Sequence, residues 1–192
     1  NLLIWIKDPR DTHFSILNEI HHTELEEGYT KHIDGYFYHK TSHISSDTKI
    51  GSGTVIRNNV VIHSNVEIGR NCIIQANTVI GNQGFGIIKD INGNNRMIQH
   101  YGGVIIGDSC NIGALNTVVS GTLAPTVLKD FVSTDDHVHI AHNVSVGKNV
   151  SIAASAEISG SVHICDSVWI GPNSSLKNGV SIGKNAFVGI GS

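Results

Sequence analysis

Histidine is the side chain of this sequence best suited to acid–base chemistry, and its twelve copies are unevenly placed. Six precede residue 44, while His63 and His163 are isolated in sequence. Three fall within residues 135–143, which read Asp-Asp-His-Val-His-Ile-Ala-His-Asn. An imidazole titrates near neutral pH, so a histidine in such a cluster can act as a general base. We take His142 as the candidate base.

A six-residue repeat must position these side chains. Every sixth residue from Ile44 to Ile80 is isoleucine, and aliphatic residues resume this spacing over 106–118 and over 128–188, with Thr134 as the exception. A period of six fits neither an α-helix nor one long alternating strand. It predicts a three-sided parallel β-helix with one short strand per face and about seven coils, in which residues 18 apart are stacked.

Two stretches interrupt the repeat. Residues 82–103 predict a loop extruded from one corner, and the ten-residue spacing between Val118 and Leu128 predicts a four-residue bulge at 122–125. Extruded loops on a rigid scaffold commonly carry function, although a tolerated insertion would look the same in sequence.

The stacking rule gives His142 a partner. Ile140 points inward in register, which leaves His142 on the outside near a corner, and Gly160 lies 18 residues further on. The Gly160 N–H could therefore face the same groove, where it could bind an oxyanion, and a glycine would let a ligand approach the backbone. An ordinary corner glycine is the alternative interpretation.

Composition excludes several functions. The net charge of −3 and the absence of a basic run give no reason to expect nucleic acid or an anionic membrane as a partner. The three cysteines form no CxxC unit and favour a reducing, cytoplasmic setting. The apolar residues 1–6 are too few for a transmembrane segment. We expect neither a structural metal nor a tightly bound cofactor.

The chain divides at residue 43. Asp8 and Pro9 predict the start of a helix of about a dozen residues, and residues 28–43 predict a linker. We expect residues 1–43 to form this helical segment and residues 44–192 to form the β-helix. Because the chain opens inside an apolar run and stops inside a repeat, we expect a longer protein.

At several motifs the sequence resembles the hexapeptide acyltransferases. Over residues 8 to about 165 it is similar to the UDP-3-O-acylglucosamine N-acyltransferases of lipid A and lipopolysaccharide biosynthesis. The residues that carry this likeness are Asp-Pro-Arg at 8–10, Cys-Ile-Ile-Gln-Ala-Asn-Thr-Val-Ile-Gly at 72–81, Gly-Phe-Gly at 84–86, Val-Ile-Ile-Gly-Asp at 104–108 and Ile-Ala-His-Asn-Val at 140–144.

The resemblance implies a left-handed β-helix and a homotrimer with active sites between subunits. It assigns the base to His142 and the oxyanion amide to Gly160, with Asp135 supporting the site. Substrate contacts fall on Phe85, Gly86, His137 and Asn143. The implied reaction moves an acyl group from the phosphopantetheine thioester of acyl carrier protein to the amine of a nucleotide-linked amino sugar. Residues 1–43 would then contain the tail of a nucleotide-binding domain.

Three alternatives remain open. Residues 168–176 and 187–192 look more like acetyl-CoA-dependent sugar acetyltransferases of surface polysaccharides. A zinc enzyme of the γ-class carbonic anhydrase type would use His137 and His142, which have the right spacing, with His100 as a third ligand. An inactive scaffold would explain why Gly179 occupies the place of the family's second histidine and Val119-Ser120 that of its acid–base pair.

Overall fold

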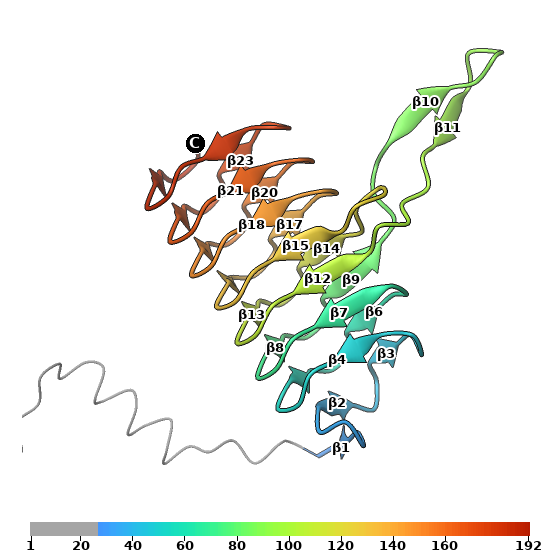
Figure 1. Ribbon diagram of the computed structural model, residues 1–192, viewed down its shortest axis with the longest axis vertical. Helices are drawn as coiled ribbons and strands as arrows, with labels where there is room; N and C mark the ends of the chain where they lie inside the picture. The colour runs from blue at the N-terminus through green and yellow to red at the C-terminus, as the bar shows by residue number, and fades with distance from the viewer. Residues whose placement is uncertain (1–26) are drawn as a thin grey trace, which may run out of the picture.

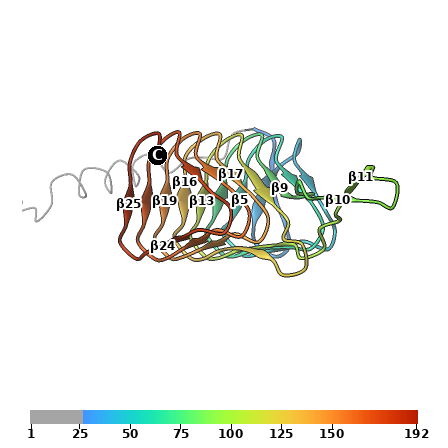
Figure 2. The same cartoon turned by 90° about the horizontal axis from the view of Figure 1, so that it is seen from above.

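The computed structural model describes residues 27–192, which form a three-sided parallel β-helix (Figure 1). Its faces are one nine-stranded and two seven-stranded sheets, and successive coils contribute one strand to each face. Seen from above, the coils stack in register and one hairpin projects from the stack (Figure 2). Eight strands of the nine-stranded sheet are stacked in parallel, against seven in each shorter sheet, so the β-helix has about eight turns where the sequence predicted about seven.

The strands are short, and within each sheet neighbouring strands are hydrogen-bonded in the following order. The nine-stranded sheet contains β1 (Tyr29–Lys31), β2 (Phe37–His39), β5 (Val55–Ile56), β8 (Ile73–Ile74), β13 (Asn111–Ile112), β16 (Ser133–Thr134), β19 (Ser151–Ile152), β22 (Trp169–Ile170) and β25 (Phe187–Val188). The second sheet contains β4 (Lys49–Ile50), β7 (Val66–Ile68), β12 (Val104–Ile106), β15 (Thr126–Leu128), β18 (Ser145–Val146), β21 (His163–Ile164) and β24 (Ser181–Ile182). The third contains β3 (His43–Ile44), β6 (Val61–Ile62), β9 (Val79–Asn82), β14 (Thr117–Val119), β17 (His139–Ile140), β20 (Glu157–Ile158) and β23 (Ser175–Leu176).

The aliphatic repeat forms the core. In the third sheet Ile62 pairs with Ile80, and Val118 pairs with Ile140, so each inward side chain stacks on its equivalent in the next coil. These four side chains are completely buried. Burial of one such side chain stabilises the fold by about 1.5–3 kcal/mol. Since each coil adds similar ladders on all three faces, the repeat itself fixes the register.

Asparagine and glycine serve different purposes at the corners. Asn59, Asn65, Asn71 and Asn77 all have φ between 55° and 60°, the left-handed region that asparagine tolerates well. Gly69, which directly follows an aliphatic position, is needed instead for close approach: a Cβ there would lie 2.6 Å from the carbonyl carbon of Gly107. Asparagine thus supplies the positive-φ corners, whereas this type of glycine lets neighbouring corners stack closely.

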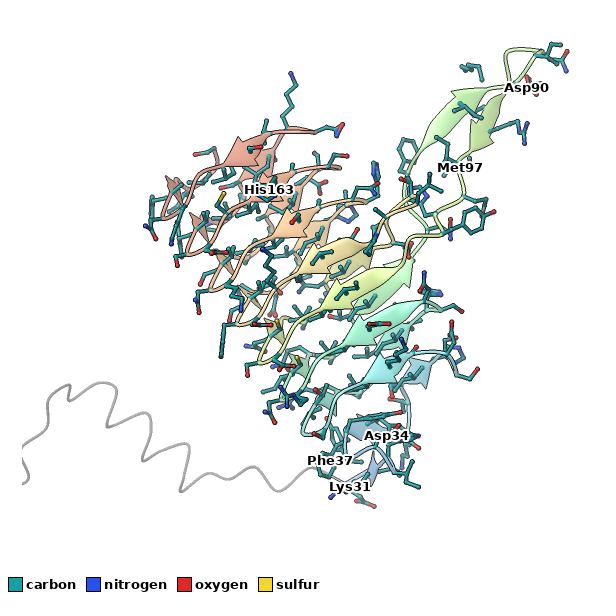
Figure 3. All side chains as sticks on the ribbon, in the orientation of Figure 1. Lys31, Asp34, Phe37, Asp90, Met97 and His163 are labelled. Atoms are coloured by element: carbon teal, nitrogen blue, oxygen red, sulfur yellow. The ribbon has the colours of Figure 1, made fainter. Side chains whose placement is uncertain are left out.

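The extruded loop is a β-hairpin. β10 (Ile87–Lys89) pairs antiparallel with β11 (Asn95–Met97), and the two protrude from the corner that follows β9 (Figure 1). Asp90 closes the turn, since its Oδ1 accepts hydrogen bonds of 2.8 Å from the backbone N–H groups of Asn92 and Asn94. Figure 3 shows Asp90 at the far tip, with Met97 on the returning strand. The predicted loop is confirmed, and it has a regular structure of its own.

The β-helix begins before the predicted boundary at residue 44. β1 and β2 form a hairpin within the expected linker, and β2 pairs in parallel with β5. Tyr36 enters the core at 8% exposure. The six-residue rule missed this segment because aromatic residues, which favour strands, replace its aliphatic positions. The predicted helix after Asp8 lies outside the described residues.

Stacked charges line the corners between the second and the nine-stranded sheets. The Arg70 guanidinium hydrogen-bonds the Asp108 carboxylate at 2.7 Å and lowers its pKa. One coil further on, the Lys148 ammonium hydrogen-bonds Asp130 at 2.7 Å and lowers the pKa of that carboxyl. These pairs link adjacent coils along one edge.

We expect this edge to make stability depend on acid pH. With folded-state pKa values below the ordinary carboxyl value of about 4, the two carboxylates stabilise the fold above that pH, and the contribution is lost as pH falls through their folded pKa values. Urea unfolding at pH 7, 4 and 3 should show the loss. A variant carrying Asp108→Asn and Asp130→Asn should lose less stability between pH 4 and 3. An unchanged pH dependence in that variant would contradict the assignment.

Within residues 27–192, no helix has the length and apolar character needed to cross a membrane.

Candidate active site

His142 lies at the corner between β17 and β18, where the chain passes from one face to the next. Ile140 and Val144, on either side of it, are buried in the core. Two inward anchors separated by one corner leave the intervening His142 side chain outside the prism, half-buried. The six-residue pattern therefore places the imidazole as the sequence predicts.

Gly160 lies directly against the imidazole, one coil further on. A Cβ at Gly160 would be 2.5 Å from the His142 Cε1 and 2.7 Å from its Nε2, so only glycine fits beneath the ring. In the described part of the chain, the Gly160 N–H donates to no protein acceptor, whereas its carbonyl accepts from the Gly179 N–H at 3.0 Å. The structure brings together the predicted base and the predicted oxyanion donor.

Asn143 fixes the imidazole tautomer. Its Oδ1 accepts hydrogen bonds from the Thr122 hydroxyl at 2.9 Å and from the His142 Nδ1 at 3.2 Å, while its amide nitrogen donates to the Ala124 carbonyl. Because Oδ1 is an acceptor, the proton of the neutral His142 ring lies on Nδ1. Nε2 is left with the lone pair that a general base needs.

The same contacts hold the four-residue bulge at 122–125. The bulge in turn receives the returning loop, since the Tyr101 N–H donates to the Thr122 carbonyl and the Gly102 N–H to the Gly121 carbonyl, both at 2.8 Å. The two interruptions of the repeat thus meet beside His142. Asn143 was expected to contact substrate, but in this structure its side chain binds the bulge and the imidazole.

We expect Asn143→Ala to destabilise the protein by about 2 kcal/mol, because it removes the partly buried hydrogen bonds to the bulge and places alanine at a φ of 60°. Asn149→Ala is the matched control: Asn149 also has positive φ, 56°, but its exposed side chain does not hold the bulge. Urea unfolding should rank Asn143→Ala as the less stable variant. Equal stability of the two would show that the bulge contacts contribute nothing.

His100 is the residue that the general-base prediction left out. Its ring centroid lies 5.3 Å from that of His142, with the planes inclined at 56°. His100 is also one wall of a cavity of about 310 Å³ next to this corner, which is lined by His63, Ser64, Asn65, Gly81, Gln83, His100, Tyr101, Gly103 and Ser120. The cavity gives a ligand room beside His100, although His142 itself is not among its lining residues.

Asp135 and His137 lie at another corner. Both are exposed between β16 and β17, one face before His142, and Asp135 Oδ1 accepts a hydrogen bond from the Asp136 N–H at 2.8 Å. Within one chain, Asp135 therefore does not reach the base, contrary to the expectation that it would stand beside it. The physical reason is the coil itself: residues seven apart occupy successive corners, and only residues a whole coil apart are stacked.

Comparison with known proteins identifies both the repeat and the fold of this chain. Residues 41–82 match the family of bacterial transferase hexapeptide repeats. The chain is a left-handed hexapeptide-repeat β-helix. The fold also matches LpxA from Acinetobacter baumannii with a TM-score of 0.68 at 23% identity, over 81% of this chain and 65% of that one. For the UDP-N-acetylglucosamine O-acyltransferase of Moraxella catarrhalis, the TM-score is 0.66 at 25% identity, over 80% and 65% of the two chains.

Curated relatives of this hexapeptide-repeat protein are named UDP-3-O-acylglucosamine N-acyltransferase. The one from Fusobacterium nucleatum is 44% identical over 69 residues, which are 36% of this chain and 20% of the relative. The one from Coxiella burnetii, strain RSA 493, is 48% identical over 69 residues, with the same shares. The matched segment thus spans about a fifth of these relatives' length, and both are acyltransferases by name.

The Gly-Phe-Gly motif of this hexapeptide-repeat protein has a structural explanation. A Cβ at Gly84 would lie 2.6 Å from the His100 Nε2, and one at Gly86 would lie 3.3 Å from the Ile98 Cβ. Gly84 therefore makes room for the His100 ring, and Gly86 makes room for Ile98. Phe85, between them, is 80% exposed at the base of the hairpin. Its predicted substrate contact therefore stays a prediction.

The three histidines proposed as zinc ligands do not come together within one chain. His137 and His142 lie at different corners, and His100 approaches His142 alone. Among residues 27–192, no three histidine, cysteine or carboxylate side chains are grouped so that they could hold a metal ion. The spacing of five residues that suggested the site separates two corners here.

Proposed function

We propose that this protein transfers an acyl group from a thioester to the amine of a nucleotide-linked amino sugar. The observation that carries the proposal is the His142 imidazole seated on Gly160, with its proton held on Nδ1 by Asn143. A free Nε2 beside a backbone N–H is the pair of groups that acyl transfer requires. The names of the curated relatives support an amino sugar as the acceptor.

The chemistry follows from these two groups. The sugar amine attacks the thioester carbonyl as His142 Nε2 removes a proton from the amine nitrogen. The carbonyl oxygen becomes an oxyanion, which the Gly160 N–H stabilises. Collapse of the tetrahedral intermediate forms the amide and breaks the carbon–sulfur bond, and the protonated imidazole returns its proton to the departing thiolate. Protons and charge are then balanced, and no tightly bound cofactor takes part.

The proposed assembly is a homotrimer with each site in the cleft between two subunits. One chain provides His142, Gly160 and His100 at one corner but leaves Asp135 and His137 at another. A neighbouring copy that presents its own Asp135 corner would supply the carboxylate that the single chain lacks. Light scattering of the purified protein tests this assembly; a monomer with full activity would exclude it.

The proposed location is the cytoplasm, where carrier-protein and CoA thioesters are available. Cys72, Cys110 and Cys165 are all unbridged, which fits a reducing compartment. Cell fractionation with an antibody against the chain tests this placement; recovery of the protein outside the cytoplasm would contradict it.

The test of function is a donor comparison on the purified protein. UDP- and dTDP-linked amino sugars are offered with hydroxyacyl carrier protein or with acetyl-CoA, and the acylated sugar is detected by mass spectrometry. We expect product with the carrier protein. Product with acetyl-CoA alone would assign the protein to sugar acetylation, whereas no product with either donor would overturn the proposal.

A further inference from the structure

The structure holds His100 firmly in place. The Gln83 side chain binds its backbone on both sides: Oε1 accepts from the His100 N–H at 2.7 Å, and the amide nitrogen donates to the His100 carbonyl at 3.0 Å. His100 Nδ1 donates to the Ile98 carbonyl at 3.0 Å. Three hydrogen bonds thus fix both the backbone and the ring of a residue that comes from a loop.

The ring is also enclosed. His100 is 3% exposed, and its Nε2 lies against Gly84, sealed from solvent and without a hydrogen-bond partner among the described residues. Leaving a buried acceptor unpaired costs about 1–3 kcal/mol, so such a histidine needs an explanation. Because Nε2 is sealed and Nδ1 is engaged, His100 is not placed to exchange protons with a substrate.

The His142 ring, in contrast, is held by few interactions among the described residues. One hydrogen bond of 3.2 Å reaches its Nδ1, and Gly160 offers no side chain. Gly160 belongs to the following coil, whereas His100 approaches from the loop of an earlier coil, so the His142 ring has neighbours from both directions. If the His100 ring were removed, the imidazole would be free to turn away from Gly160.

We infer that His100 is a positioning residue that keeps the His142 imidazole over the Gly160 amide. The inference rests on the proposed function and adds a residue that acts through the base. It also gives the Gly-Phe-Gly motif a purpose, since Gly84 makes the space that His100 occupies. The hairpin base, the bulge and the base histidine then form one connected unit.

The test compares His100→Ala with His100→Gln, which keeps a planar group able to donate to the Ile98 carbonyl. We expect His100→Ala to lower kcat about 10–100-fold, the scale of a 1 Å misplacement, with KM changed less than about 3-fold. His100→Gln should recover most of the lost kcat. Unchanged kcat in His100→Ala, a loss confined to KM, or no recovery in His100→Gln would each overturn the inference.

A second measurement does not require turnover. The rate at which diethyl pyrocarbonate modifies His142, followed by peptide mass spectrometry, should rise several-fold in His100→Ala and return towards the wild-type rate in His100→Gln. If the wild type transfers no acyl group, the proposed function fails while this measurement still decides the positioning role. An unchanged modification rate in His100→Ala would exclude that role.

Discussion

Replacement of His142 by alanine should lower kcat about 10³-fold, within the range that positioned general bases contribute. The variant keeps Ile140 and Val144, the two buried anchors of this corner, so the fold should be unchanged. KM should change little, because the imidazole acts on the proton of the bound amine. Steady-state kinetics with whichever donor gives product in the donor comparison is the measurement.

The matched control is His163→Ala. His163 is an exposed histidine at the start of β21, labelled in Figure 3, and among the described residues its side chain makes no hydrogen bond or ring contact with His142. We expect wild-type kcat from this variant. A comparable loss in both variants would mean that the defect is not specific to the corner, and full activity of His142→Ala would remove the base from the account.

Gly160→Ala should lower kcat about 100-fold, the effect expected when a reacting group is displaced by about 1 Å. The new methyl group would lie 2.5 Å from the His142 Cε1, so the imidazole must move. Gly160 is not among the glycines with positive φ, which means that alanine is not strained by its own backbone. The loss would therefore report the contact with His142.

Gly183→Ala is the control for this substitution. Gly183 also lies in the repeat, its φ is not positive, and a Cβ there would meet no atom within 4 Å. This variant should keep both stability and kcat. If Gly160→Ala behaved in the same way, the close approach of the glycine to the imidazole would have no role in catalysis.

The periodic part of the molecule could be predicted from sequence. Ile62, Ile80 and Ile140 are in register because one aliphatic residue per face must enter a narrow core, and this requirement repeats from coil to coil, with Thr134 as the polar exception. The same arithmetic placed Gly160 against His142. Where a residue's position follows from the repeat, sequence is sufficient.

The surroundings of His142 outside the repeat could not be predicted from residue spacing. The family resemblance placed Asp135 beside His142, but residues that are seven apart occupy different corners of one coil, so a single chain does not bring the two side chains together. His100 lies in a loop that does not follow the six-residue period, so its contact with His142 could not be derived from the spacing of residues. Phe131 and Leu115 hold positive φ, 61° and 57°, because the stacked corners impose it even on residues that disfavour it.

The central claim, that this corner performs acyl transfer to an amine, is tested most directly by following thiol release from the acyl thioester. The assay offers either a nucleotide-linked amino sugar or the same sugar with its amine blocked by acetylation. We predict thiol release matched by acylated product with the free amine, and background release with the blocked sugar. Equal release with both sugars, or none with either, would contradict the account.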